Sequence, residues 1–109
     1  MENKALRHNA DKPKWGLIHY ASILPLVKVL MFGAKKYVPD NWKQPMSRRE
    51  ILESMQRHLS ALMDGEECDQ ESGELHTGHI MANAMFWNYH YENAEREKVL
   101  KHIQDLGKM

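Results

Sequence analysis

The stretch that decides the fold runs from residue 57 to residue 90 and reads RHLSALMDGEECDQESGELHTGHIMANAMFWNYH. Apolar residues recur at helical spacing on both sides of a short segment that contains Gly65 and Gly73, which is typical of two helices joined by a turn. We call residues 64–74 the acidic turn, because six carboxylates gather there: Asp64, Glu66, Glu67, Asp69, Glu71 and Glu74. An ordinary turn between two helices needs far less negative charge, so the pattern predicts that the acidic turn binds a ligand.

The residues after the acidic turn place polar side chains on one side of the next helix. His79, Asn83, Trp87 and His90 follow His76 at offsets of 3, 7, 11 and 14. On a period of 3.6 residues these positions fall within a sector of roughly 80°. Carboxylates of the turn should therefore face imidazoles and an amide, an arrangement that suits a bound cation.

The remaining pattern predicts an all-α fold. Ser22 is the expected N-cap of a helix from Ile23 to about Tyr37, and the capping box from Ser47 to Glu50 starts a second helix that ends before Gly65. The third helix should begin near Leu75. Residues 92–107 form an amphipathic tail, and the sequence leaves open whether the third helix bends near Asn93 or continues unbroken. We expect one domain over residues 1–109, with an irregular arm at residues 1–20.

Composition limits the classes of function. Fifteen basic and fifteen acidic residues cancel, which argues against binding to a nucleic-acid polymer or a membrane surface. The lone Cys68 cannot form an internal disulfide, and no signal-like or membrane-length apolar run occurs, so we expect a cytoplasmic protein. A chain of 109 residues cannot enclose a large pocket. We therefore expect a hairpin or four-helix-bundle-like domain that is completed by assembly into a homodimer or homotetramer.

The residue types favour a hard cation over other metals. Mg²⁺ takes one or two carboxylates and leaves its other positions to water and phosphate oxygens. A zinc site is disfavoured because there is a single cysteine and the turn is rich in oxygen ligands, and the EF-hand spacing is absent. The alternative interpretation is a solvated acidic loop without a ligand.

A second group of candidate residues lies at the end of the first expected helix. Lys35 and Lys36 suit the helix dipole, but beside Tyr37, Asn41 and Trp42 they also suit phosphates and a base. Trp15 in the arm either anchors the arm on the body or stacks on a ligand.

Ordered motifs along the chain carry a resemblance to a known family. They are K-P at Lys12-Pro13, G-A-K-K-Y and N-W between Gly33 and Trp42, R-H at Arg57-His58, G-E-x-x-D-x-E-S-G from Gly65 to Gly73, and H-x-x-H-x-x-x-N from His76 to Asn83. Over about residues 7 to 90 the chain resembles the phage dATP/dGTP diphosphohydrolase family, which includes the MazZ type and is similar to the MazG-like all-α nucleotide pyrophosphohydrolases. The resemblance implies Mg²⁺- or Mn²⁺-dependent cleavage of a deoxynucleoside triphosphate to the monophosphate and pyrophosphate by helical dimers or tetramers. For a phage-encoded enzyme the compartment would be the host cytoplasm.

The resemblance also implies roles for single residues. Metal ligands would be Glu66, Asp69, Glu71, His79 and Asn83. Substrate-binding residues would be Lys12, Trp15, Lys35, Lys36, Tyr37, Asn41, Trp42 and Arg57, with the cations on the phosphates and the aromatic residues at the base.

The predicted function is hydrolysis of dGTP or dATP, with Glu66 as the base that deprotonates the attacking water and with His58 and His76 as its catalytic neighbours. The alternative is a non-catalytic helical binding or regulatory protein, in which the histidines and acids form an interface network.

Overall fold

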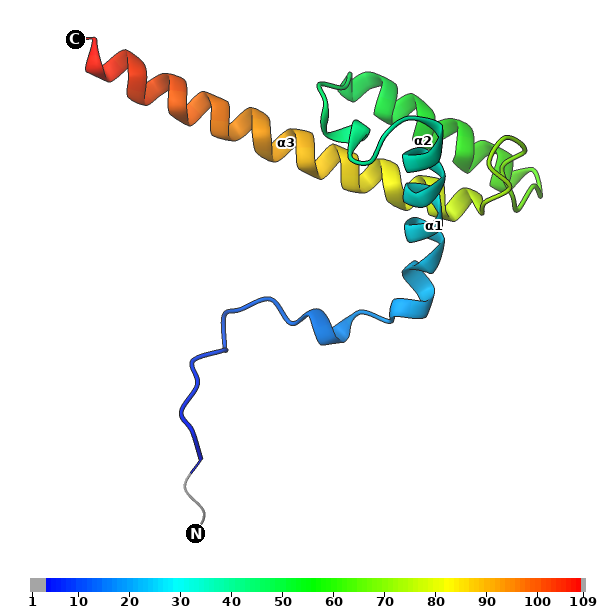
Figure 1. Ribbon diagram of the computed structural model, residues 1–109, viewed down its shortest axis with the longest axis horizontal. Helices are drawn as coiled ribbons and strands as arrows, with labels where there is room; N and C mark the ends of the chain where they lie inside the picture. The colour runs from blue at the N-terminus through cyan, green and yellow to red at the C-terminus, as the bar shows by residue number, and fades with distance from the viewer. Residues whose placement is uncertain (1–3, 109) are drawn as a thin grey trace.

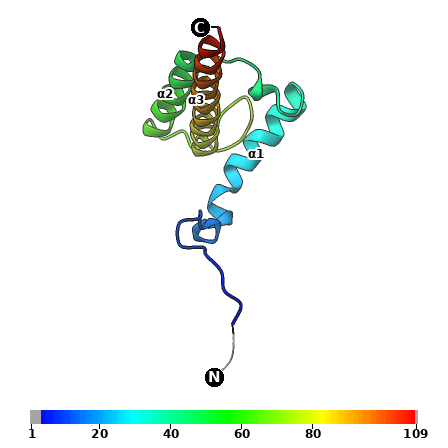
Figure 2. The same ribbon diagram turned by 90° about the vertical axis from the view of Figure 1, so that its left-hand side faces the viewer.

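The computed structural model describes residues 4–108, and its helices agree with the predicted all-α class. Three α-helices follow one another: α1 (Tyr20–Lys36), α2 (Arg48–Met63) and α3 (His76–Gly107). Two short 3-10 helices, η1 (Trp15–Leu17) and η2 (Asn41–Lys43), precede α1 and α2. α3 packs against both other helices, and α1 and α2 lie on its two sides (Figures 1 and 2).

The first helix begins earlier than predicted. Its N-cap is His19 and not Ser22, so Tyr20 is already helical and Pro25 lies in the second turn instead of the first. The predicted start was wrong because Ser22 already lies inside the first helical turn, where its hydroxyl is 2.7 Å from Nδ1 of the N-cap residue His19.

The start and end of α2 agree with the sequence pattern. The hydroxyl of Ser47 accepts a hydrogen bond from the backbone N–H of Glu50 at 3.3 Å, as an N-cap does. Gly65 has a φ of 95°, which favours glycine in the position just after a helix. These two signals fix where α2 enters and leaves the acidic turn.

The predicted tail is not a separate helix. α3 has 32 residues and continues without a bend past Asn93, so it is about 48 Å long. Its C-terminal part extends beyond α1 and α2 (Figure 1). Four apolar side chains of that part are 53% to 59% exposed: Val99, Leu100, Ile103 and Leu106.

Close contact between α1 and α3 depends on one glycine. A Cβ atom built on Gly78 would lie 2.5 Å from the carbonyl oxygen of Pro25, so the two backbones approach to a distance that no side chain permits. Near this contact lies a small core, in which Val29, Ile51 and Ala82 are the buried apolar residues of the described chain.

Over residues 4–14 the predicted arm lacks regular structure, and it leads away from the helical body (Figures 1 and 2). Trp15 is 68% exposed, so this tryptophan does not anchor the arm on its own chain.

Candidate functional site

A polar cavity of about 680 Å³ lies where the acidic turn meets the helices. α1, α2, the acidic turn and α3 all contribute to its wall. Among the predicted site residues, it is lined by Tyr37, Arg57, His58, Glu66, Asp69, Glu71, His76, His79 and Asn83. The predicted meeting of turn acids with the imidazole side of the third helix is confirmed, because Asp69 Oδ2 lies 3.7 Å from His79 Nε2.

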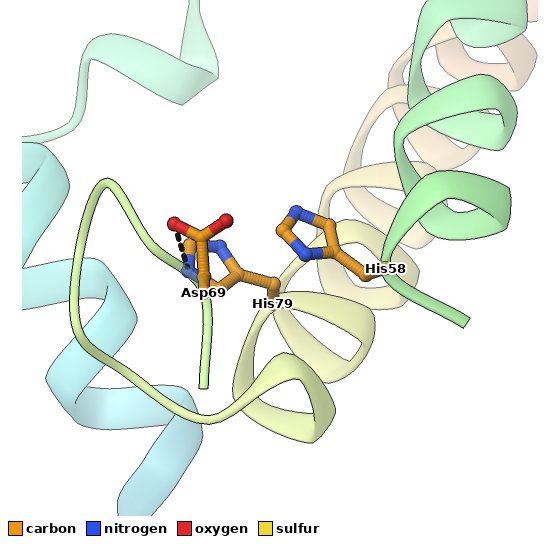
Figure 3. A group of neighbouring side chains, drawn as sticks. All are labelled: His58, Asp69 and His79. Carbon is orange, nitrogen blue, oxygen red and sulfur yellow. Dashed lines mark ion pairs between the residues drawn. The ribbon is translucent and has the colours of Figure 1, made fainter. Parts of the chain in front are cut away.

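Three side chains in this cavity form a candidate metal site. One ligand atom from each of His58, Asp69 and His79 lies within 4.8 Å of the others. His58 comes from α2, Asp69 from the acidic turn and His79 from α3, and all three converge on one space (Figure 3). The two imidazole rings are stacked, with centroids 4.3 Å apart and planes 4° from parallel.

Hydrogen bonds within the acidic turn fix the position of Asp69. Its Oδ2 accepts from the backbone N–H of Ser72 at 2.9 Å and from the Ser72 hydroxyl at 3.0 Å. The backbone closes around it, since Asp69 N–H donates to the carbonyl of Glu74 at 2.8 Å and Gly73 N–H donates to the carbonyl of Asp69 at 2.8 Å. Gly73 has a φ of 73°, which makes this tight turn possible without strain.

A third histidine, His76, contacts the ring of His58. Nδ1 of His58 lies 2.8 Å from Nδ1 of His76, so one of these nitrogens carries a proton and the other accepts it. On the far side of the His76 ring, Nε2 lies 3.3 Å from Glu66 Oε1. A proton on that nitrogen is favoured by the carboxylate, so His58 donates from Nδ1 and keeps the lone pair of its Nε2 free for a ligand.

His76 is itself unusual. His76 is only 3% exposed. Its Nε2 has no hydrogen-bond partner within residues 4–108, because the contact with Glu66 lacks hydrogen-bond geometry. A buried polar atom without a partner is costly. Both His76 and Glu66 line the polar cavity.

The electrostatics of the cluster keep its ligand atoms in the form that a metal requires. Burial lowers the pKa of His58, and the neighbouring His79 lowers it further. Burial also lowers the pKa of His79, against the opposing effect of Asp69. The pKa of Asp69 is lowered because the two hydrogen bonds from Ser72 outweigh the effect of burial. Two neutral imidazoles and one carboxylate are therefore present near neutral pH.

These shifts predict a pH dependence of stability. Because the pKa values of His58 and His79 are lower in the folded protein than their ordinary value of 6.5, the unfolded chain binds more protons below that pH. The free energy of unfolding of the metal-free protein should therefore decrease as the pH falls from about 6.5 toward 5. Urea unfolding across this range measures the decrease. His58→Gln should reduce it, while His102→Gln in the exposed tail should leave it unchanged, and an unchanged slope in His58→Gln would contradict the assignment.

An apolar cavity of about 390 Å³ adjoins the polar one. The two share Val29, Tyr37, Glu71 and Phe86, so an apolar cavity and a polar cavity lie side by side. The ring of Trp42 stacks on Phe86 with centroids 5.0 Å apart, and its backbone carbonyl lies 2.8 Å from Nε2 of His90. The contact with His90 fixes η2 on α3, and with it the Trp42 ring that lines the apolar cavity.

The predicted substrate-binding residues divide between several places. Lys36, Tyr37, Asn41 and Trp42 line the apolar cavity, and Arg57 lines the polar one. Lys35 faces a separate shallow pocket with Lys28 and Ser72. Lys12 and Trp15 lie in the arm and line neither cavity of their own chain.

The predicted metal ligands also divide. Asp69 and His79 belong to the three-residue cluster, whereas Glu66 faces His76 and Glu71 is paired with the ammonium of Lys36. The Asn83 amide nitrogen donates to Ser54 and to the carbonyl of His79, so this residue ties α3 to α2 beside the cluster. His58, which was predicted as a catalytic neighbour, belongs to the same three-residue cluster.

The residues of the cluster fit a divalent metal ion. Two imidazoles and one carboxylate form a mixed nitrogen and oxygen donor set, and each imidazole has its second nitrogen engaged by a neighbouring side chain, as metal-binding histidines usually do. This set is less oxygen-rich than the one predicted from the sequence, because the structure selects two histidines and only one of the six acids of the turn.

The architecture and the cavity define an all-α protein with a candidate metal centre beside an apolar pocket. Within residues 4–108, none of the helices is both long and apolar enough to span a lipid bilayer. Residues 2–100 match the family described as dATP/dGTP diphosphohydrolase, N-terminal, and the chain belongs to this family. Comparison with curated proteins and with solved structures gave no match.

Proposed function

We propose that this protein hydrolyses a purine deoxynucleoside triphosphate, dGTP or dATP, to the monophosphate and pyrophosphate with the help of a divalent metal ion. The observation that carries the proposal is the pair of adjoining cavities, in which an apolar aromatic cavity shares lining residues with a cavity lined by histidines and acids. A nucleotide has the same division between a flat apolar base and an anionic phosphate chain. Membership in a diphosphohydrolase family supports this choice of substrate.

His58, Asp69 and His79 would hold the metal ion. When bound, such an ion neutralises phosphate charge and makes an attacking water easier to deprotonate. Of the two ions expected, Mn²⁺ suits two imidazoles and one carboxylate better than Mg²⁺, which prefers oxygen ligands and retains water.

The base would lie in the apolar cavity against the Trp42 ring, near Asn41. Arg57, in the wall of the polar cavity, would bind the phosphates. Lys36 is paired with Glu71 at the boundary between the two cavities, and this pairing raises the pKa of its ammonium group. A triphosphate would offer Lys36 a stronger anionic partner than a single carboxylate does.

Glu66 is the proposed general base. Its carboxylate accepts a proton from the attacking water, the new bond forms between that oxygen and phosphorus, and the anhydride bond between the first and second phosphates breaks to release pyrophosphate. Nε2 of His76 lies 3.3 Å from the Glu66 carboxylate, and the hydrogen bond between His58 and His76 fixes the His76 ring beside it.

We further propose that the subunits assemble as homodimers or homotetramers. A compact monomer of this mass exposes about 6,300 Å², whereas this chain exposes 9283 Å². The difference of about 3,000 Å² is several times the roughly 800 Å² that each partner buries in a standard interface. The apolar side of the α3 tail and the stripe of Tyr20, Leu24, Val27 and Met31 on α1 are exposed and suited to burial between subunits. Light scattering should give a multiple of 12.8 kDa.

Turnover with defined substrates tests the proposed function. The protein with Mn²⁺ or Mg²⁺ should release pyrophosphate, and not orthophosphate, from dGTP or dATP, and Glu66→Gln should abolish the release while the helical circular dichroism is retained. We place this activity in the cytoplasm, where nucleotide pools are found. If no triphosphate is cleaved and neither metal nor nucleotide raises the melting temperature, a non-catalytic binding protein is the correct interpretation.

Replacement of Trp42 by alanine should raise KM for the purine substrate and lower kcat/KM by about tenfold to a hundredfold, the usual effect of losing a stacked base. The control is Tyr91→Ala, which removes an exposed aromatic ring outside both cavities and outside the α1 stripe. Equal kcat/KM values in Trp42→Ala and the wild type would place the base elsewhere.

A further inference from the structure

The Ser72 side chain makes three polar contacts in the site, although no role was predicted for this residue from the sequence. Its hydroxyl donates to Asp69 Oδ2 at 3.0 Å and lies 2.7 Å from Nε2 of His79. It also accepts from the backbone N–H of Glu74 at 3.2 Å. One hydroxyl therefore connects the carboxylate and one imidazole of the candidate metal cluster with the backbone of the acidic turn.

The hydrogen bonds of the Ser72 hydroxyl determine which ring nitrogen of His79 carries the proton. A serine hydroxyl has one hydrogen to donate and two lone pairs to accept with. The hydrogen goes to the Asp69 carboxylate, which can only accept, so both lone pairs receive N–H groups, one from Glu74 and one from His79. His79 must then carry its proton on Nε2, and no hydrogen bond within residues 4–108 engages the lone pair of its Nδ1.

The same contact selects the free oxygen of Asp69. Oδ2 is occupied by the Ser72 hydroxyl and the Ser72 backbone N–H, whereas no hydrogen bond to Oδ1 occurs within residues 4–108. Figure 3 shows the Asp69 carboxylate above the His79 ring, with His58 turned toward both. Metal-binding histidines usually donate their second ring N–H to a group that fixes their orientation, and Ser72 stands in that place.

We propose that Ser72 is the positioning residue of the metal centre, whose hydroxyl sets the tautomer of His79 and the orientation of the Asp69 carboxylate before a divalent ion binds. This inference rests on the proposed function only in taking the cluster to bind a metal ion. It assigns Ser72 no contact with the substrate or with the reacting atoms.

The hydroxyl can be removed without dismantling the acidic turn. In Ser72→Ala the hydrogen bond from the backbone N–H of residue 72 to Asp69 is retained. So are the backbone bonds from Asp69 to Glu74, from Gly73 to Asp69 and from His76 to Glu67. The variant therefore isolates the hydroxyl, and Ser72→Thr returns it.

Calorimetric titration of the full-length, metal-free protein with MnCl₂ tests the proposal. Ser72→Ala should raise the Kd for Mn²⁺ by about tenfold to a hundredfold, while the melting temperature without metal stays close to that of the wild type. Ser72→Thr should restore the wild-type Kd, and Ser60→Ala, on the exposed face of α2, should not change it.

The outcomes separate the two ideas. If the wild type binds Mn²⁺ and Ser72→Ala binds it equally well, the positioning role is overturned while the metal centre stands. If Ser72→Thr fails to restore affinity, or if Ser72→Ala loses metal-free stability together with affinity, Ser72 is only structural. If the wild type binds no Mn²⁺ at all, both the metal centre and the positioning role are overturned.

Discussion

Replacement of Asp69 by asparagine should abolish measurable Mn²⁺ binding and lower the rate of pyrophosphate release by at least about 100-fold. Asp69 supplies the only carboxylate of the three-residue cluster, so the substitution removes the full negative charge that attracts the cation. Asparagine keeps the shape of the side chain, and its amide oxygen can still accept from Ser72. The loss should therefore come from the charge and not from a collapsed turn.

The matched control is Glu67→Gln, which also removes one carboxylate from the acidic turn. Glu67 is exposed, and its side chain does not line the polar cavity. Isothermal titration with MnCl₂ and a pyrophosphate assay should show wild-type behaviour for this control. Retention of both metal affinity and turnover in Asp69→Asn would exclude the cluster as the metal centre.

Replacement of Gly78 by alanine should lower the free energy of unfolding by about 2 kcal/mol. The new Cβ would lie 2.5 Å from the oxygen and 2.8 Å from the carbon of the Pro25 carbonyl, and neither backbone atom can rotate away. Overpacking of this kind costs about 1–3 kcal/mol, and we expect the upper end, because α1 and α3 must separate. The higher helix propensity of alanine offsets about 1 kcal/mol of that destabilisation.

The control for this prediction is Gly33→Ala. Gly33 also lies in a helix, but nothing comes within 4 Å of the Cβ that would be added there. This variant should be more stable by up to about 1 kcal/mol, because alanine favours the helix. Urea unfolding should therefore give opposite signs for the two substitutions, and the same sign for both would mean that α1 and α3 are not in close contact.

The sequence was informative wherever the signal was local. Ser47 caps α2 and Gly65 ends it because a hydroxyl and a missing Cβ act on the backbone of their own neighbours. The meeting of Asp69 with His79 was also predictable, since a short turn cannot place its acids far from the first turns of the next helix. Helical periodicity was enough for the all-α class.

The sequence was less informative wherever two side chains compete for a third. The sequence alone does not distinguish the six acids of the turn. In the structure, Lys36 pairs with Glu71, His76 faces Glu66, and only Asp69 joins the candidate metal cluster. Ser72 was overlooked as a functional residue because a serine beside a glycine usually indicates only a turn. The signal that was available is its place between Asp69 and His79 in the G-E-x-x-D-x-E-S-G and H-x-x-H motifs.

By itself the sequence determined that this chain is helical, where its second helix starts and ends, and that acids and imidazoles meet at one turn, because each of these follows from interactions between residues close in the chain. Only the tertiary structure decided that His58 joins Asp69 and His79, that Glu71 is paired with Lys36, and that Trp15 lines neither cavity. Those outcomes depend on how α1 and α2 dock on α3, and the close contact of Gly78 with Pro25 sets the distance between α1 and α3.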